Sequence, residues 1–161
     1  MKKYLRLISG AIAILAIFMM FLPQVLLKYP STGHLESIGV KALLGGNYAY
    51  TGTKIEHPVV SGFVGYLLLG VGGIIILLCA LVPYIKNHDV LSMVITGLGV
   101  VVIIVGIILI FLIRRNFVNT VPSPVPDKNT YVGWGAMVGG SLGSVAGLGG
   151  ILAIVFDLLE K

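Results

Sequence analysis

Long apolar runs alternate with shorter polar segments along the chain, and this pattern predicts four membrane-spanning helices. The runs cover about residues 7–27, 61–82, 90–113 and 132–156. Each is close to the ~20 apolar residues that a helix needs to cross a bilayer. We therefore expect an all-α membrane protein, a single domain over residues 1–161, folded as an antiparallel four-helix transmembrane bundle.

The first apolar run could also be a secretory signal, because the basic segment MKKYLR precedes it. Its apolar length exceeds the ~7–15 residues of a signal's core, and no small-x-small cleavage site follows it. We expect a retained helix instead. Pro23, near the end of the run, is expected to kink or stop this helix.

The polar segments 28–60 and 114–131 are expected to be external loops. Within the first, SIGVKALLGG predicts either a short amphipathic helix with a glycine stop or a strand. NYAYTGTKI alternates like a strand, with Gly52 in a turn. A small ordered lid, either a hairpin or a helix plus a strand, is therefore expected on the bundle. In the second loop, the alternate prolines of VPSPVP favour a stiff, extended connector.

Glycines recur in register along the fourth run. Gly135, Gly139, Gly143 and Gly147 are four residues apart, and Gly140 falls on the same half of a helical wheel. Glycine is a poor helix former in water, but in lipid a helix is nearly obligatory and small residues let another backbone approach closely. The stripe predicts close helix packing. Three alternatives remain open for what this stripe faces. It can pack within the bundle, against a partner chain or a second copy, or around a pore or lipid groove.

The composition supports a membrane protein and offers little buried chemistry. The chain is 57% hydrophobic and 11% charged, against about 25% charged in soluble domains. The apolar runs lack ionisable residues, and Asp157 and Glu160 are expected at the cytoplasmic rim of the fourth helix. This pattern disfavours a proton-coupled transporter or a membrane protease, which need polar groups at depth. The single cysteine, Cys79, allows no disulfide within the chain.

The placement of basic residues predicts the orientation. Lys2, Lys3 and Arg6 favour a cytoplasmic N-terminus, and four spans return the C-terminus to the same side. Arg114 and Arg115, directly after the third run, depart from this rule. They are expected to anchor the helix end by snorkelling, or to contact a lipid headgroup or another anion. The net charge of +5 fits anionic headgroups, and no basic stripe interleaved with aromatics points to nucleic acid.

His34, Glu36, Glu56 and His57 flank the two ends of the first external loop. They could form a zinc site if the ends of the loop meet, but two fragments some twenty residues apart are not a ligand-spacing motif. We read them as solvated surface groups and expect no metal and no cofactor.

Tyr29, Tyr66, Tyr131 and Trp134 fit an aromatic belt near the outer membrane interface. In the inner turn, Asp89 is expected to start the third helix, where its charge favours the helix dipole.

The layout resembles the small uncharacterised four-span membrane proteins common in bacteria. The resemblance rests on the MKK start, a first helix ending in FLP, a long external loop containing GG, a short basic turn and a glycine-rich last helix. It implies a plasma-membrane protein and carries over no functional residue. The claudin-type plan also has a large first loop, but claudins carry a tryptophan and a cysteine pair there, and this loop has neither.

These observations favour a non-enzymatic accessory or structural protein that packs in the bilayer with itself or with a larger membrane complex. The alternative is a small passive pore or a lipid-binding transport component, since neither needs a titrating residue. The expected location is the plasma membrane, multi-pass, with both termini in the cytoplasm.

Overall fold

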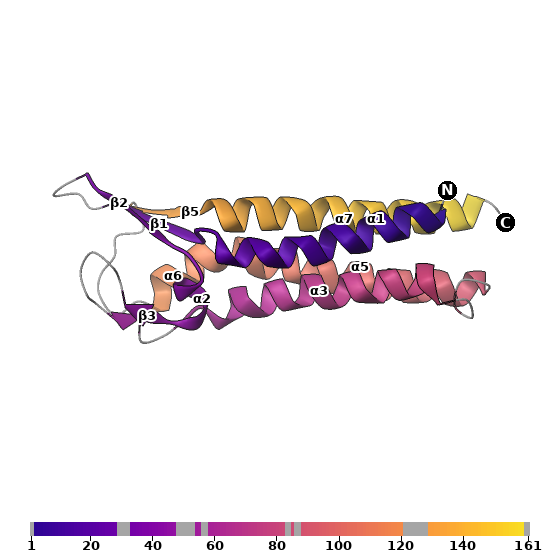
Figure 1. Cartoon of the computed structure of the whole chain (residues 1–161), viewed down its shortest axis with the longest axis horizontal. Coiled ribbons are helices and arrows are strands. Elements are labelled where there is room, and N and C mark those ends of the chain that lie inside the picture. The colour runs from indigo at the N-terminus through magenta and orange to yellow at the C-terminus, as the bar shows by residue number, and fades with distance from the viewer. Residues whose placement is uncertain are drawn as a thin grey trace.

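The computed structural model describes residues 2–28, 33–47, 54–55, 58–82, 85, 88–120 and 129–159. Four long helices pack together, each neighbouring two others: α1 and α5 each contact both α3 and α7 (Figure 1). Their bounds are α1 Lys2–Ile17, extended by the 3-10 turn η1 Phe18–Phe21, then α3 Val60–Leu81, α5 Asp89–Phe111 and α7 Trp134–Leu159. All four are long and apolar enough to cross a membrane.

The N- and C-termini lie together at one end of the bundle, called the terminal end below (Figure 1). The strands lie at the opposite end, called the sheet end. There β1 Val25–Lys28 pairs antiparallel with both β2 Leu35–Ile38 and β5 Thr130–Val132, so that it is the central strand of three. A second pair joins β3 Gly46–Asn47 and β4 Lys54–Ile55.

The predicted first helix over residues 7–27 is wrong at both ends. The helix begins earlier, at Lys2, and regular helix stops at Ile17, so that the last part of the apolar run forms strand β1. Pro23 explains why no helix continues beyond η1, because proline lacks an N–H and disfavours helical backbone at the residue before it, and Leu22 is extended with φ −76° and ψ 165°. Strand pairing with β2 and β5 then supplies the backbone hydrogen bonds that the helix no longer provides.

The predicted loop over residues 114–131 is also wrong in its first part. Helix α6, Ile113–Thr120, follows α5 after a single-residue break at Leu112. Ile113 and Phe117, one helical turn apart, are both fully buried. Burial of this apolar pair against the sheet end explains why helix persists beyond the candidate membrane span Asp89–Phe111. The VPSPVP segment lies outside the described residues.

The predicted 28–60 lid is ordered where the structure describes it. It holds strand β2 and the short helix α2 Lys41–Leu44, so both the strand and the helix alternatives for this lid occur. Gly45 ends α2 with φ +86°, a conformation that favours glycine. Gly52 lies outside the described residues.

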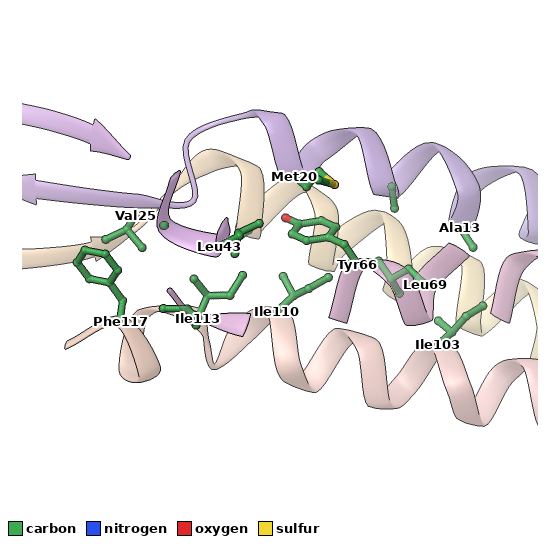
Figure 2. Close-up of a cluster of buried hydrophobic side chains, with 14 of the residues drawn as sticks. Ala13, Met20, Val25, Leu43, Tyr66, Leu69, Ile103, Ile110, Ile113 and Phe117 are labelled. Carbon is green, nitrogen blue, oxygen red and sulfur yellow. The ribbon is translucent and has the colours of Figure 1, made fainter. Parts of the chain in front are cut away.

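Large side chains fill the middle of the bundle. Tyr66 and Leu69 from α3 and Ile103 and Ile110 from α5 are fully buried, and they lie between the helices alongside Ala13 of α1 (Figure 2). The outer faces carry exposed apolar residues along all four helices. The bundle therefore has a packed interior and an apolar exterior, which agrees with four helices apolar enough to cross a membrane.

Candidate functional site

Three polar side chains from three helices meet inside the terminal end. Arg6 of α1 forms an ion pair with Asp157 of α7, and the Arg6 Nε donates to the Thr96 Oγ1 of α5 at 3.0 Å. The Thr96 hydroxyl donates in turn to the backbone carbonyl of Ser92 at 2.7 Å. The side chains of Arg6 and Asp157 are only 4% and 1% exposed. Such charge-assisted bonds are directional, and away from water they are costly to break, so this terminal cluster fixes how the three helices are placed against one another.

Sequence reasoning missed this cluster by placing Arg6 among the cytoplasmic anchors and Asp157 at the rim. Helical periodicity carried a signal. Arg6 lies three residues before Ser9 and seven before Ala13, both buried. Asp157 lies four residues after buried Ala153, which continues the small-residue stripe of α7. Both charges therefore share the faces that pack inward.

A second contact joins α1 to α7, one helical turn further along α1. The Ser9 hydroxyl donates to the backbone carbonyl of Ala146. A β-carbon built on Gly149 would lie 3.2 Å from the Ser9 Cβ, so the two helices approach closely here. Beside this contact is an apolar groove of about 280 Å³, whose other lining residues are Leu5, Ile8, Ile12, Val145, Leu148 and Leu152.

A polar hub closes the sheet end of the bundle. The Tyr66 hydroxyl lies 2.9 Å from both the Gln24 Oε1 and the Gly135 carbonyl. The Gln24 Nε2 donates to the carbonyls of Met19 and Leu22 at 2.7 and 2.9 Å. The expected place of Tyr66 in an aromatic belt is therefore wrong, because its ring is fully buried. The hub joins α3, α7 and the turn that follows η1.

The predicted glycine stripe faces the interior of the bundle. All five glycines are buried, and in four of them an added β-carbon would crowd a neighbour. The neighbours are the Met19 carbonyl for Gly135, the Tyr66 ring for Gly139, the Phe111 ring for Gly140, and Ile107 with Leu69 for Gly143. Gly147 differs, because a β-carbon there would make only an ordinary contact with Ile103 at 3.7 Å.

Helix backbones touch directly along the sides of α3. A β-carbon on Gly106 of α5 would lie 2.7 Å from the Gly65 carbonyl of α3. Gly72 of α3 and Gly99 of α5 repeat the arrangement. A β-carbon on Gly72 would lie 2.8 Å from the Gly99 carbonyl, and one on Gly99 would lie 3.0 Å from the Gly72 carbonyl. We expected backbone approach on α7, but there the glycines mostly make room for large side chains of α3 and α5. Seams in which glycines of two long helices face each other lie between α3 and α5 and, through Gly10 and Gly73, between α1 and α3. A β-carbon on Gly10 would lie 2.8 Å from the Gly73 carbonyl.

Arg114 and Arg115 lie near the start of α6 at the sheet end. Both line a pocket of about 360 Å³, together with Val118 and Asn119. The Arg114 Nε also donates to the Thr130 carbonyl of β5 at 2.7 Å, which fixes the plane of its guanidinium. The structure thus brings the two predicted anion-binding residues into one pocket.

Other predicted outer residues are only partly described. Glu56, His57 and Tyr29 lie outside the described residues, while Trp134 and Tyr131 are 65% and 47% exposed. His34 is exposed as expected, but the expectation of a solvated surface group is wrong for Glu36, which is buried in strand β2. Within the described ranges, no group of three His, Cys, Asp or Glu side chains could hold a metal ion.

The fold defines a helical bundle with four candidate membrane spans. No protein-family model matches the sequence, and comparison with curated proteins and with solved structures returns no match.

Proposed function

We propose that this chain is a non-enzymatic membrane protein of accessory or structural type, which packs with a larger membrane complex or with itself. The terminal cluster carries the proposal. Its charged groups, Arg6 and Asp157, pair with each other, and Arg6 also donates to Thr96, so these buried charges bridge helices. Ionisable groups within membrane bundles usually mark transport or catalysis; here their geometry supports assembly.

The proposed setting is the plasma membrane, with the four helices antiparallel and both termini in the cytoplasm. Lys2 and Lys3 on the first span support this orientation. Arg6 gives less support for this orientation than its position in the sequence suggests, because its charge is paired with Asp157 inside the bundle.

A firmly tied interior leaves the apolar outer faces as the surfaces that meet other molecules. Exposed apolar side chains line the outside of every long helix, for example Leu15, Val71, Val101 and Leu148. In lipid these faces contact acyl chains or the helices of another membrane protein, and association depends on packing rather than on expulsion of water.

The alternative is a passive pore or a lipid-handling component. The apolar groove between α1 and α7 favours lipid handling, because apart from Ser9 its lining is apolar. Conduction through one copy is disfavoured, since Tyr66, Leu69 and Ile103 fill the interior between the helices (Figure 2). A pore would require several copies around a shared axis.

The test is extraction of the native protein into lipid nanodiscs without detergent, followed by particle mass measurement and identification of copurifying proteins. The proposal expects a stoichiometric second membrane protein or a defined homo-oligomer. A monomer that carries only lipid would contradict it and favour the alternative. Ion-flux and lipid-transfer assays in liposomes then separate a pore from a lipid carrier.

A variant pair tests the packing role of α7. Gly139→Leu/Gly143→Leu places large side chains against Tyr66 and Leu69, so assembly and folded yield should collapse. Val138→Leu/Val145→Leu adds bulk to the exposed face of the same helix and should leave the folded yield unchanged. Normal yield and migration of the glycine variant would contradict packing along this stripe.

A further inference from the structure

Helix α6 is held as a firm platform at the sheet end. Ile113 and Phe117 anchor its inner face in the core with no exposed surface. The Asn116 Nδ2 donates to the Ser61 Oγ of α3 at 2.8 Å, and the Arg114 Nε donates to the Thr130 carbonyl of β5 at 2.7 Å. Three contacts to different elements thus fix the helix that carries the two-arginine pocket, which reduces the entropy lost when a ligand binds.

The chemistry of the pocket suits a phosphate group. Its described lining contains two guanidinium side chains, Arg114 and Arg115, the amide of Asn119 and the apolar side chain of Val118. A guanidinium matches two phosphate oxygens with parallel hydrogen bonds. The amide can donate a further bond, and Val118 can contact the apolar part of a ligand.

The depth of the pocket points to a lipid as the source of the phosphate. Arg114 follows Phe111, the last residue of α5, by three positions, or ~4.5 Å along a helix. Phe111 is 49% exposed and Trp134, at the same end, is 65% exposed, as expected of aromatics at a membrane interface. The headgroup layer on each side of the hydrocarbon core is about 5–8 Å thick. In the membrane setting proposed above, with Phe111 at the edge of the hydrocarbon core, the pocket lies at the level of lipid phosphates.

We propose that the pocket formed by Arg114, Arg115, Val118 and Asn119 binds the phosphodiester of an anionic phospholipid. Two guanidinium charges favour a headgroup of net negative charge over a zwitterionic one, whose ammonium group they repel. The proposal rests on the membrane setting proposed above, but on no particular partner protein. In this site Arg115 is the main phosphate ligand. Arg114 contributes positive charge and forms one side of the pocket, held in place by its bond to the Thr130 carbonyl.

The test is a titration of the purified chain in non-ionic detergent with short-chain phosphatidylglycerol, in which native mass spectrometry counts bound lipids. The wild-type chain should hold one lipid preferentially, and phosphatidylcholine should bind more weakly. Arg115→Gln should weaken the first binding step about fivefold, because one basic residue near a lipid surface contributes about that factor. Arg115→Lys should recover part of the loss, since it keeps the charge without the paired donors.

Lys28→Gln is the matched control, because it removes an exposed positive charge from the sheet end without touching the pocket. It should bind lipid as the wild type does. Equal weakening by Lys28→Gln and Arg115→Gln would overturn the site in favour of general electrostatic attraction. Inorganic phosphate that displaces the lipid at equal concentration would also overturn the proposal, since a soluble anion would then be the better ligand. Circular dichroism of Arg115→Gln checks that the variant folds.

Discussion

Removing one charge of the Arg6–Asp157 pair should destabilise the bundle much more than removing both. In Asp157→Leu the Arg6 guanidinium, in a residue only 3% exposed, loses its counter-charge and keeps its bond to Thr96. Breaking a buried ion pair by removing one partner costs about 3–5 kcal/mol. Because the pair lies near a helix end, where an arginine can reach toward water, we expect the lower part of this range, about 3 kcal/mol.

The double variant Arg6→Met/Asp157→Leu removes both charges and keeps side chains of similar bulk. Replacement of a buried ion pair by apolar residues is often neutral or stabilising. Thr96 retains its bond to the Ser92 carbonyl in this variant. The double variant should therefore lie within about 1 kcal/mol of the wild type, and the double-mutant cycle should show a coupling of at least about 2 kcal/mol.

The assay is equilibrium unfolding in mixed micelles, with far-ultraviolet circular dichroism recorded as the fraction of denaturing detergent rises. Asp89→Leu serves as the control, because it removes an exposed carboxylate at the start of α5 and should cost only about 0.3–1 kcal/mol. Additive losses, with the double variant as unstable as the two single variants combined, would refute the reasoning that the charges hold each other inside the bundle.

Three further outcomes are expected in the same system. Gly106→Ala should cost ~1–3 kcal/mol of unfolding free energy, because its β-carbon would lie 2.7 Å from the Gly65 carbonyl. Gly97→Ala on the same helix should be neutral or stabilising, because its β-carbon would meet only Ile154, at 3.9 Å. Equal unfolding midpoints of the two variants would contradict the α3–α5 seam. Tyr66→Phe should cost about 1–2 kcal/mol through loss of its buried bonds at the hub; an unchanged unfolding curve would count against the hub. Trp134, the only tryptophan, should be quenched more strongly by lipids brominated near the headgroup than near the chain end; the reverse order would place it too deep.

The four spans could be predicted from hydropathy because apolar length alone decides which segments can cross a bilayer. The internal boundaries of the first run could not. Residues 25–27 are as apolar as the helix before them, and their strand pairing depends on β2 and on β5, which is about a hundred residues away in the sequence. Pro23 was the local sign that helix ends there, and it outweighs the hydropathy of the residues that follow.

The buried Arg6–Asp157 ion pair was not predicted from the sequence, because both residues lie near the ends of the chain. Charges at the ends of membrane helices usually reach the interface, so Arg6 and Asp157 looked like anchors. Only their alignment with the inward faces of α1 and α7 marks them as buried, and their meeting at Thr96 depends on the helix arrangement. Arg114 and Arg115 were recognised as a candidate pair from the sequence, whereas the pocket that contains them depends on helix α6, which was not expected.

Side-specific labelling tests the proposed four-span architecture most directly. In a Cys79→Ser background, single cysteines at Tyr4, Leu159 and Leu35, which are exposed by 69%, 75% and 58%, are treated in intact cells with a membrane-impermeant maleimide. The account predicts that Leu35→Cys is labelled at once, and that Tyr4→Cys and Leu159→Cys are labelled only after the membrane is opened. Labelling of Tyr4→Cys and Leu159→Cys from opposite sides would contradict it.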